Sequence, residues 1–219
     1  MIRVMLVDDQ AVVRAGFRVL LEEPDDVEVV AEASTGPDAV RAAMREHPDV
    51  VCMDLRMPGG DGLAATREIL AAAEDDPDWS PSILVVTTFD LDEYLFGALE
   101  AGASGFVLKD CEPEELVDAI RRLAAGEGLL QSAVTRRVIA EFGRRRGSAA
   151  SSPVADSLTE RETDIVRLLA QGMSNAEIAA ALVVEVTTVK SHLGRAMTKI
   201  GARDRVQTVV WAHRNGLAD

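Results

Sequence analysis

The sequence predicts two domains of different fold class, an α/β domain with a doubly wound parallel sheet and a smaller all-α domain. In the first half of the 219-residue chain, short β-branched runs alternate with stretches of helical periodicity, as expected for repeated βα units. Residues 147–156 (GSAASSPVAD) are small, polar and free of aromatic side chains, which is typical of a flexible linker. After this linker the apolar spacing is helical throughout, so we expect no sheet in the second domain.

The strands are identified by short apolar runs that are bounded by polar residues or glycine. We expect five strands, each followed by a helix, at residues 2–7, 27–31, 50–53, 83–87 and 104–108. An additional helix is expected at residues 132–146, where apolar residues recur at helical spacing. The predicted domain limits are residues 1–125 for the α/β domain, 126–156 for a linker that contains this helix, and 157–219 for the all-α domain.

Charge is distributed unevenly between the two halves of the chain. The net charge is −14, but residues 1–125 contain 10 Lys and Arg against 27 Asp and Glu, whereas residues 126–219 contain 13 against 10. The second half is therefore mildly basic. Such a balance permits contact with nucleic acid, although a solvated surface can have the same composition.

The composition also bears on location and on thiol chemistry. No run of about 18 apolar residues occurs, and the pair Asp8-Asp9 comes too early for a signal peptide. We therefore expect a cytoplasmic protein that does not enter the membrane. The two cysteines, Cys52 and Cys111, lack the paired spacing of a metal site, so both are expected to be packed thiols.

Chemically reactive side chains stand at the ends of the expected strands. They are Asp8, Asp9, Asp54, Thr87 and Lys109. Because the carboxyl ends of parallel strands lie at one edge of a sheet, these side chains should meet there. Three carboxylates, a hydroxyl and an ammonium group suit a divalent metal ion together with a phosphoryl group.

Four motifs at these positions resemble the receiver domain of bacterial two-component response regulators. They are VDD at 7–9, MDLRMPGGDG at 53–62, TT at 87–88 and GASGFVLKD at 102–110. The resemblance covers roughly residues 1–125 and implies a flavodoxin-like sheet with the strand order 2-1-3-4-5. It also implies that a sensor histidine kinase phosphorylates Asp54.

The resemblance further implies that Mg²⁺ binds beside the phosphorylation site. The ligands would be Asp8, Asp9, Asp54 and the backbone carbonyl of Arg56. A carboxylate can attack a phosphoryl group and form an acyl phosphate if a metal ion neutralises the crowded charge. The alternative for Asp8 or Asp9 is a helix N-cap, a common role of aspartate before a helix.

Phosphoryl binding and switching would involve three further residues, according to the same resemblance. Lys109 would pair with the phosphoryl oxygens, the Thr87 hydroxyl would bind one of them, and Phe106 would follow the inward movement of Thr87. Thr87 and Phe106 could instead be ordinary strand residues, and Lys109 a surface amine.

Two segments of this half depart from the usual pattern of the family. The pair Gly59-Gly60 follows Asp54 and adds backbone freedom to the loop. Residues 74–81 (EDDPDWSP) are longer and more acidic than usual. Trp79 in this segment is either a packing anchor or a contact for a partner.

Helix caps are evident in the second domain. Thr159 with Glu162, and Ser174 with Glu177, each fit a capping box, which places a helix start directly after each hydroxyl residue. Gly172 is expected to end the first of these helices.

The stretch LTERETDIVRLLAQGMSNAEIAAAL and the later TTVKSHLGRAMTKIGARDR resemble the LuxR-type helix-turn-helix domain of the NarL/FixJ group of response regulators. The resemblance covers roughly residues 157–217 and implies four helices. One of them, from about Thr187 to Lys199, would be a recognition helix that enters the major groove of double-stranded DNA.

The resemblance assigns the DNA contacts to six residues of this helix. Lys190 and Ser191 are expected at base edges, where sequence is read. Contacts to phosphates or neighbouring bases are expected from Thr188, His192, Arg195 and Lys199. Arg195 and Lys199 could instead belong to a solvated helix face.

The recognition helix has two unusual features. Glu185-Val186 stands where the family usually has a small hydroxyl cap, so Thr187 is expected to cap the helix instead. Gly194 lies in mid-helix, at a cost of about 1 kcal/mol relative to alanine. It either permits close approach to DNA or removes a contact that relatives make.

The combined features predict a DNA-binding transcriptional response regulator, which forms a homodimer on DNA when Asp54 is phosphorylated. We do not expect an enzyme, beyond weak self-phosphorylation from small phosphodonors and autodephosphorylation, because no second acid or base accompanies Asp54. The alternatives are a phosphatase or phosphotransferase, a regulator that responds to a ligand instead of phosphate, and a pure protein-interaction switch.

Overall fold

The computed structural model describes residues 1–57, 60–87, 97–127 and 158–218. The chain divides into two compact units, Met1–Leu129 and Leu130–Asp219. The helix expected at 132–146 and the expected linker at 147–156 lie outside the described residues. The domain limits derived from the sequence therefore stay a prediction.

The N-terminal unit is built around a parallel sheet of five strands. They are β1 Ile2–Val7, β2 Val27–Ala33, β3 Val50–Met53, β6 Ser82–Thr87 and β7 Gly105–Leu108. Their order, β2-β1-β3-β6-β7, confirms the predicted order 2-1-3-4-5. A short antiparallel pair, β4 Arg56–Met57 and β5 Gly60–Asp61, follows β3 and was not predicted.

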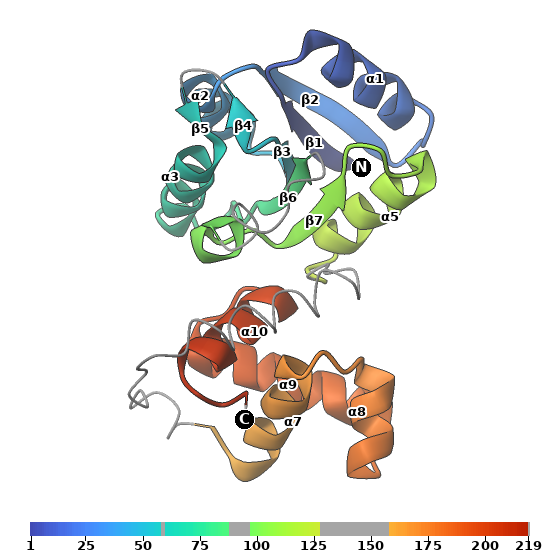
Figure 1. Ribbon diagram of the computed structural model, residues 1–219, viewed down its shortest axis with the longest axis vertical. Helices are drawn as coiled ribbons and strands as arrows, with labels where there is room; N and C mark the ends of the chain where they lie inside the picture. Colours follow the sequence, from blue (N-terminus) through green and yellow to red (C-terminus); the bar gives the residue numbers. More distant parts are fainter. Residues whose placement is uncertain (58–59, 88–96, 128–157, 219) are drawn as a thin grey trace. The chain divides into compact units, whose positions relative to one another are not determined.

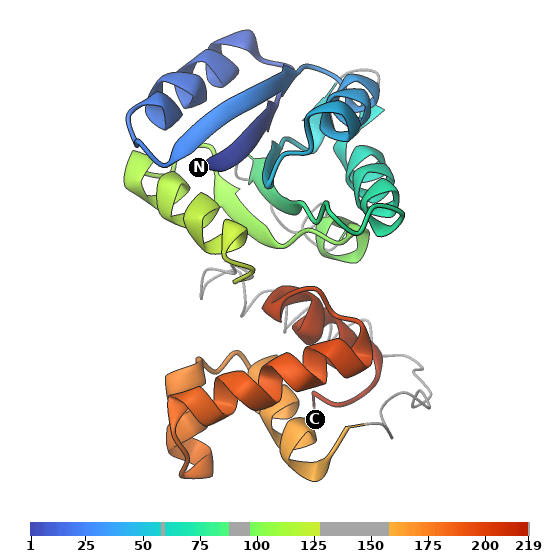
Figure 2. The same ribbon diagram turned by 180° about the vertical axis from the view of Figure 1, so that it is seen from behind.

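Helices cover both faces of this sheet. Helices α1 Ala11–Glu22 and α5 Pro113–Ala124 lie on one face, and α2 Gly36–Glu46 and α3 Gly62–Glu74 on the other (Figures 1 and 2). Residues 97–101 are also helical. This arrangement is the expected doubly wound α/β fold, in which both sheet faces are buried.

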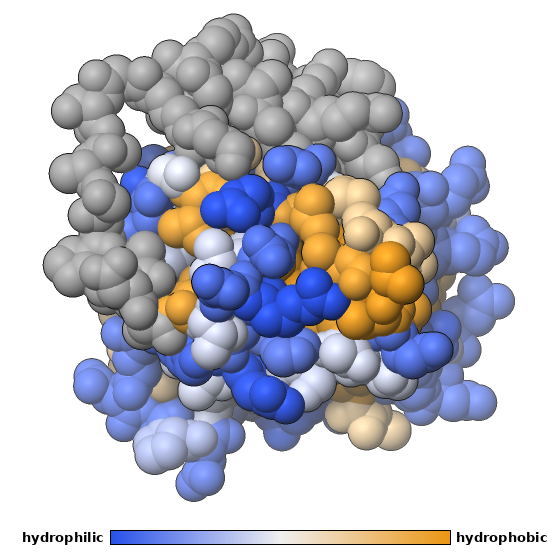
Figure 3. Space-filling model, turned by 90° about the horizontal axis from the view of Figure 1, so that it is seen from below, coloured by the Kyte–Doolittle hydropathy of each residue, from blue (hydrophilic) through white to orange (hydrophobic). Residues whose placement is uncertain are grey.

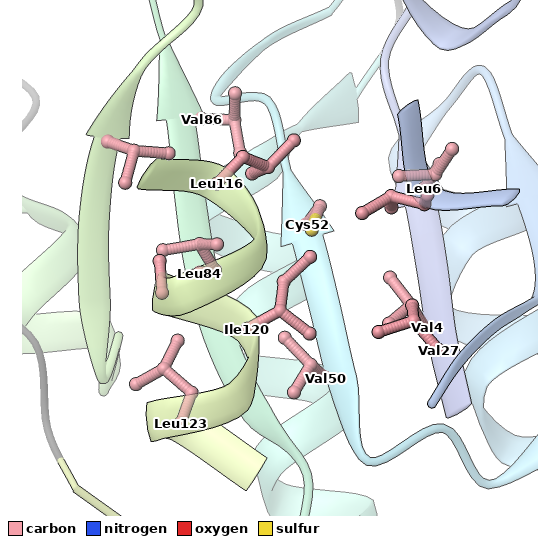
Figure 4. Close-up of a cluster of buried hydrophobic side chains, with 13 residues drawn as sticks. Val4, Leu6, Val27, Val50, Cys52, Leu84, Val86, Leu116, Ile120 and Leu123 are labelled. Carbon is pink, nitrogen blue, oxygen red and sulfur yellow. The ribbon is translucent and has the colours of Figure 1, made fainter. Parts of the chain in front are cut away.

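The core beneath α5 follows from the alternation of side chains along the strands. Strand residues Val4, Leu6, Val50, Cys52, Leu84 and Val86 share one cluster with Leu116, Ile120 and Leu123 of α5 (Figure 4). The α5 residues recur at helical spacing, and the strand residues at every second position. The intervening strand residues, such as Met5, Met53 and Val85, are equally buried and line the opposite face.

Trp79 lies in the segment between α3 and β6, where the sequence left its role open. Its side chain is buried, its indole N–H donates to the carbonyl of Pro48 at 3.0 Å, and its ring stacks on His47 with 4.8 Å between centroids. Trp79 therefore anchors this segment by packing. The two cysteines are packed thiols as expected, because both are free, with Cys52 buried and Cys111 half-buried.

The described part of the C-terminal unit is helical. Its helices are α7 Glu160–Ala170, α8 Asn175–Leu182, α9 Val186–Ile200 and α10 Arg205–Arg214. Both predicted capping boxes are present, with Thr159 and Ser174 as N-caps. Gly172 follows α7 with a positive φ of 89°, a backbone conformation that favours glycine and ends the helix as expected.

Helices α8 and α9 are joined by a short turn and share one core. Ile178 of α8, Val189 and Leu193 of α9, and Ile165 of α7 belong to the same buried cluster. The expectation that Thr187 caps α9 was wrong. The N-cap is Glu185, two residues earlier, because Glu185 has an extended backbone and its carbonyl accepts hydrogen bonds from the backbone N–H groups of Thr188 and Val189.

Exposed apolar side chains mark the turn between α8 and α9. Among the described residues of the C-terminal unit, the large hydrophobic side chains that are exposed are Val183 and Val186. Figure 3 shows apolar side chains that reach the surface beside strongly hydrophilic ones on the face it presents. Within the described ranges, no helix has both the length and the apolar character needed to cross a membrane.

Candidate functional site

The acidic residues expected at the edge of the sheet do come together. Strands β1 and β3 are neighbours with Val7 opposite Met53, so Asp8 and Asp54 follow adjacent strand ends. One carboxylate oxygen from each of Asp8, Asp9 and Asp54 lies within 4.8 Å of the others. Asp8 and Asp54 are buried, and Asp9 is half-buried.

Lys109 completes this cluster from the end of β7. Its backbone N–H donates to the carbonyl of Thr87 at 2.8 Å, which fixes the residue beside the end of β6. Its ammonium Nζ lies 2.6 Å from Asp8 Oδ2 and 2.7 Å from Asp54 Oδ2, and the side chain is only 11% exposed. The alternative of a surface amine is therefore wrong.

The electrostatics of Lys109 reflect two opposing effects. Burial acts to lower the pKa of Lys109, but the hydrogen bonds to Asp54 and Asp8 outweigh burial and raise this pKa above its usual value. The ammonium group is consequently charged at neutral pH. It neutralises part of the negative charge that three neighbouring carboxylates concentrate at this edge.

The hydrogen bonds of the three carboxylates leave one buried oxygen without a partner. Asp8 Oδ1 accepts a hydrogen bond from the Gln10 backbone at 2.9 Å, and Asp54 Oδ1 accepts one from the Arg56 backbone at 3.2 Å. Asp9 Oδ1 is buried and has no hydrogen-bond partner. A buried carboxylate oxygen without a partner is costly, and three carboxylates suit a hard divalent cation, so these residues fit Mg²⁺.

Neither Asp8 nor Asp9 caps a helix. Helix α1 begins at Ala11, and Gln10 occupies the N-cap position without a side-chain hydrogen bond to the helix. The N-cap alternative is therefore wrong for both aspartates. Their side chains serve the acidic cluster instead.

Gly62 holds the chain after Asp54 in place, which the sequence did not reveal. A Cβ atom at this position would lie 2.3 Å from the Asp54 carbonyl oxygen and 2.8 Å from Cα of Leu55. Both atoms belong to the backbone, so no side-chain rearrangement could relieve the clash. The glycine at the end of the MDLRMPGGDG motif was the available signal, since glycine permits such close backbone approach.

Thr87 and Phe106 lie on the adjacent strands β6 and β7. Thr87 is buried at the end of β6, opposite Leu108, and Phe106 is a fully buried side chain of β7, opposite Val85. The two residues therefore occupy neighbouring strands close to Lys109. Whether they move together stays a prediction, as does the metal contact of the Arg56 carbonyl.

The C-terminal unit presents an exposed face of α9. Lys190, Ser191 and Arg195 are exposed, whereas Val189 and Leu193 on the opposite side are buried in the core. Arg195 Nη2 donates to Ser191 Oγ at 3.0 Å, one helical turn away. Three of the six residues expected to contact DNA thus share one outer face.

The other three residues that were expected to contact DNA are partly buried or already paired within the protein. Thr188 and His192 are half-buried, and His192 Nδ1 is buried without a hydrogen-bond partner. Lys199 Nζ lies 2.7 Å from Glu162 Oε2, and the Glu162 side chain is only 2% exposed. Within the described structure, the Lys199 ammonium is therefore already paired.

Glu162 joins the start of α7 to the end of α9. The Glu162 carboxylate accepts hydrogen bonds from Lys199 and from the backbone N–H of Thr159, at 2.7 and 2.8 Å. The Lys199 ammonium, helped by the Thr159 N–H, lowers the pKa of Glu162 to about 2. The sequence predicted the capping box but not the ion pair, because that pair depends on how α7 and α9 cross.

Comparisons with known proteins identify the family of both units. Residues 4–121 match the response regulator receiver domain, and residues 156–212 match the bacterial regulatory proteins of the luxR family. The transcriptional regulatory protein LiaR of Bacillus subtilis (strain 168) is 41% identical over 219 residues, which cover 100% of both chains. The oxygen regulatory protein NreC of Staphylococcus aureus (strain MRSA252) is 39% identical over 220 residues, with 99% of each chain covered.

A solved structure supports the same assignment along the whole chain. The crystal structure of the response regulator ChrA of a heme-sensing two-component system is 37% identical, with a TM-score of 0.52. The match covers 99% of this chain and 98% of that of ChrA. An acidic edge in an α/β unit is followed in the chain by a helix-turn-helix unit, and relatives with both units match along the full length. The chain therefore belongs to the two-component response regulators that pair a receiver domain with a LuxR-type DNA-binding domain and regulate transcription.

Proposed function

We propose that Asp54 accepts a phosphoryl group from a sensor histidine kinase. A carboxylate oxygen of Asp54 would form a bond to phosphorus while the bond between phosphorus and its donor breaks, which gives an acyl phosphate. The observation that carries this proposal is the convergence of two further carboxylates and the Lys109 ammonium on Asp54. This arrangement offers a nucleophile together with neutralising charge.

Asp8, Asp9, Asp54 and the backbone carbonyl of Arg56 would hold Mg²⁺ beside that nucleophile. The metal ion would neutralise the charge of the incoming phosphoryl oxygens. The buried, unpartnered Oδ1 of Asp9 supports this role. Lys109, which now bridges Asp8 and Asp54, would transfer part of its interaction to the phosphoryl oxygens as they arrive.

Thr87 and Phe106 would convert phosphorylation into a change of surface. The Thr87 hydroxyl would bind a phosphoryl oxygen, and the ring of Phe106 would repack on the neighbouring strand. Their burial on adjacent strands next to Lys109 supports this coupling. A local change in charge would thereby alter the packing of the sheet edge.

Helix α9 would read DNA in the major groove. The exposed Lys190 and Ser191 would contact base edges, and Arg195 would contact phosphates. Thr188 and His192 would reach the DNA only at the border of this face, and Lys199 would do so only by leaving Glu162. Phosphorylation would favour a homodimer that binds paired half-sites on the DNA. The protein would act in the cytoplasm, where the DNA is found.

Intact-protein mass spectrometry after incubation with acetyl phosphate and Mg²⁺ tests the phosphorylation site. We expect one added phosphoryl group on the wild type and none on Asp54→Asn, with circular dichroism used to verify that the variant is folded. An adduct on both proteins would place the site elsewhere. An adduct on neither, even with purified kinases, would favour a regulator that works without phosphate.

DNA selection from a random pool tests the output. The phosphorylated wild type should select a defined sequence, as a palindrome or a tandem repeat, and bind it more tightly than Asp54→Asn. Equal affinity of the two proteins would contradict control by phosphorylation. A multiple-turnover assay on phosphate esters should show no reaction beyond slow hydrolysis of the protein's own acyl phosphate.

A further inference from the structure

Gly194 lies in the middle of the exposed face of α9, at a position where glycine is unfavourable. It is one turn from Lys190 on one side and one turn from Thr198 on the other, within the helix Val186–Ile200. Glycine in a helix interior is destabilising relative to alanine. The chain therefore carries a destabilising residue at the centre of this face.

Backbone geometry does not explain this glycine. The glycines with positive φ among the described residues are Gly102, Gly126, Gly172, Gly201 and Gly216, and Gly194 is not one of them. Its backbone is that of an ordinary helical residue, which every L-amino acid except proline adopts readily.

Packing inside the chain does not explain it either. A Cβ atom at Gly194 would have no heavy-atom neighbour within 4 Å, apart from the helix itself. By contrast, a Cβ atom at Gly62 would lie 2.3 Å from the backbone, and one at Gly105 would lie 3.0 Å from Leu123. Gly194 is thus open to whatever approaches α9 from outside.

The neighbouring side chains are held along the helix by hydrogen bonds. Arg195 reaches back one turn to Ser191 at 3.0 Å, and the Thr198 hydroxyl donates to the carbonyl of Gly194 itself at 3.1 Å. Gly194 itself is half-buried, and its carbonyl is occupied by the Thr198 hydroxyl. What stays open at this residue is the space beside its Cα atom, where a side chain would otherwise stand.

We propose that Gly194 determines DNA specificity, because it lets the backbone of α9 lie against one base pair at a distance that any side chain would prevent. This inference rests on the proposed entry of α9 into the major groove. Lys190 and Ser191 would supply the polar contacts to base edges, and Gly194 would set how deeply the helix sits. Since base edges differ in shape, close approach would select the base pair that leaves room for the backbone.

The test uses the phosphorylated full-length chain and two glycine-to-alanine variants. Gly194→Ala adds one methyl group to the proposed contact. Gly16→Ala is the matched control, because Gly16 also lies in mid-helix, in α1, and a Cβ atom there would also meet nothing within 4 Å. Both variants should melt at or above the wild-type temperature, since alanine favours helices.

The wild type first selects its preferred DNA from a random pool, and all three proteins are then measured on that DNA at one salt concentration. We expect Gly16→Ala to bind within about twofold of the wild type, and Gly194→Ala to bind roughly tenfold or more weakly, the size of the effect of one mismatched base pair. Repeated selection with Gly194→Ala should change the preferred base at one position per half-site.

Two results would overturn the inference. In the first, Gly194→Ala keeps the wild-type affinity and selects the same sequence. In the second, it loses affinity equally on selected and random DNA, which would show a loss of general contact without specificity. Failure of the wild type to select any sequence is a different result, because it would overturn the proposed DNA-reading role of α9 and this inference with it.

Discussion

The acidic edge of the N-terminal unit and the outer face of α9 assemble polar side chains in opposite ways. At the acidic edge, Asp8, Asp54 and Lys109 come from three different strand ends and are nearly excluded from solvent. On α9, Lys190 and Ser191 are adjacent, Arg195 lies one turn further along the same helix, and all three are exposed. The first group is assembled by tertiary folding, and the second by helical periodicity alone.

This difference determines how much of the role of each site can be read from contacts within the protein. A buried charge needs a partner within the protein, so the contacts around Asp54 and Lys109 already define which atoms work together. An exposed charge is solvated by water, so its functional partner is defined only when a ligand binds. Changes at the acidic edge should therefore alter folding and function together, whereas changes on α9 should alter function alone.

Lys109→Met should have the largest effect on folding. It would leave Asp8 and Asp54 without the ammonium that joins them, and removal of one partner from a buried ion pair costs about 3–5 kcal/mol. Urea unfolding should show this loss, and saturating Mg²⁺ should restore part of it by replacing the missing positive charge.

Arg122→Met is the matched control for that prediction, because Arg122 on α5 is 44% exposed and pairs with exposed carboxylates. Its loss should change the free energy of unfolding by less than about 1 kcal/mol. If Lys109→Met and Arg122→Met lowered the free energy of unfolding by similar amounts, buried and exposed ion pairs would contribute equally to the stability of this protein.

Gly62→Ala should destabilise the N-terminal unit by about 1–3 kcal/mol, because its Cβ atom would clash with backbone that cannot yield without moving Asp54. The same substitution at Gly16, where a Cβ atom meets nothing, should be neutral or stabilising. Urea unfolding compares the two, and the mass assay should show slower phosphorylation for Gly62→Ala alone. If Gly62→Ala were as stable as the wild type, the close approach to Asp54 would be wrong.

Glu162→Gln should destabilise the C-terminal unit in a pH-dependent way. The pKa of Glu162 is lowered from 4.5 to about 2, so the unfolded state takes up a proton first as the pH falls. The stabilisation by the Glu162 carboxylate is fully present above about pH 4.5 and disappears as the pH approaches 2. The difference in stability between wild type and variant should therefore be larger at pH 7 than at pH 3.

Glu177→Gln offers the comparison for that experiment. Glu177 closes the second capping box and also has a lowered pKa, mainly because its carboxylate accepts a hydrogen bond from the Ser174 backbone N–H. No lysine contributes to that shift. Fluorescence of Trp211 in a Trp79→Phe background reports on the C-terminal unit, since the chain contains two tryptophans. An equal effect of both substitutions would show that the Lys199 pair adds nothing to the cap.

The smallest effect is expected for cations on α9, and it should concern DNA binding alone. Arg195→Ala should lower the salt dependence of DNA affinity by about one unit of slope, as expected for one lost phosphate contact. Lys199→Ala should leave this slope unchanged, because its ammonium is paired with Glu162. Equal slopes for the two variants would show that Lys199 leaves Glu162 when DNA binds.

The sequence predicted the sheet well because four of the five strands end at a chemically distinct residue. Asp8, Asp54, Thr87 and Lys109 mark strand ends that the apolar runs also mark, so two independent signals coincide. β2 lies at the edge of the sheet and extends two residues beyond the prediction, because a polar residue such as Glu32 can continue an exposed edge strand. The two-residue strands β4 and β5 are too short to produce any periodicity.

The features that the sequence missed depend on contacts between distant parts of the chain. The Glu162–Lys199 pair and the support of Asp54 by Gly62 both require knowledge of how elements approach each other. The start of α9 was misplaced for a different reason: side-chain capping was expected, but the backbone of Glu185 alone begins the helix. Local signals predict where elements lie, and they predict poorly which side chains meet.

The buried thiol of Cys52 gives the N-terminal unit an internal reporter of the core beneath α5. Burial raises the pKa of this thiol to about 12, so almost none of it is thiolate at neutral pH while this core is closed. Cys111 is half-buried, and its raised pKa has the same main cause together with the charge of Glu115. Alkylation of Cys111 would thus proceed first, and the later alkylation of Cys52 would time the departure of α5 from the face of the sheet that it covers.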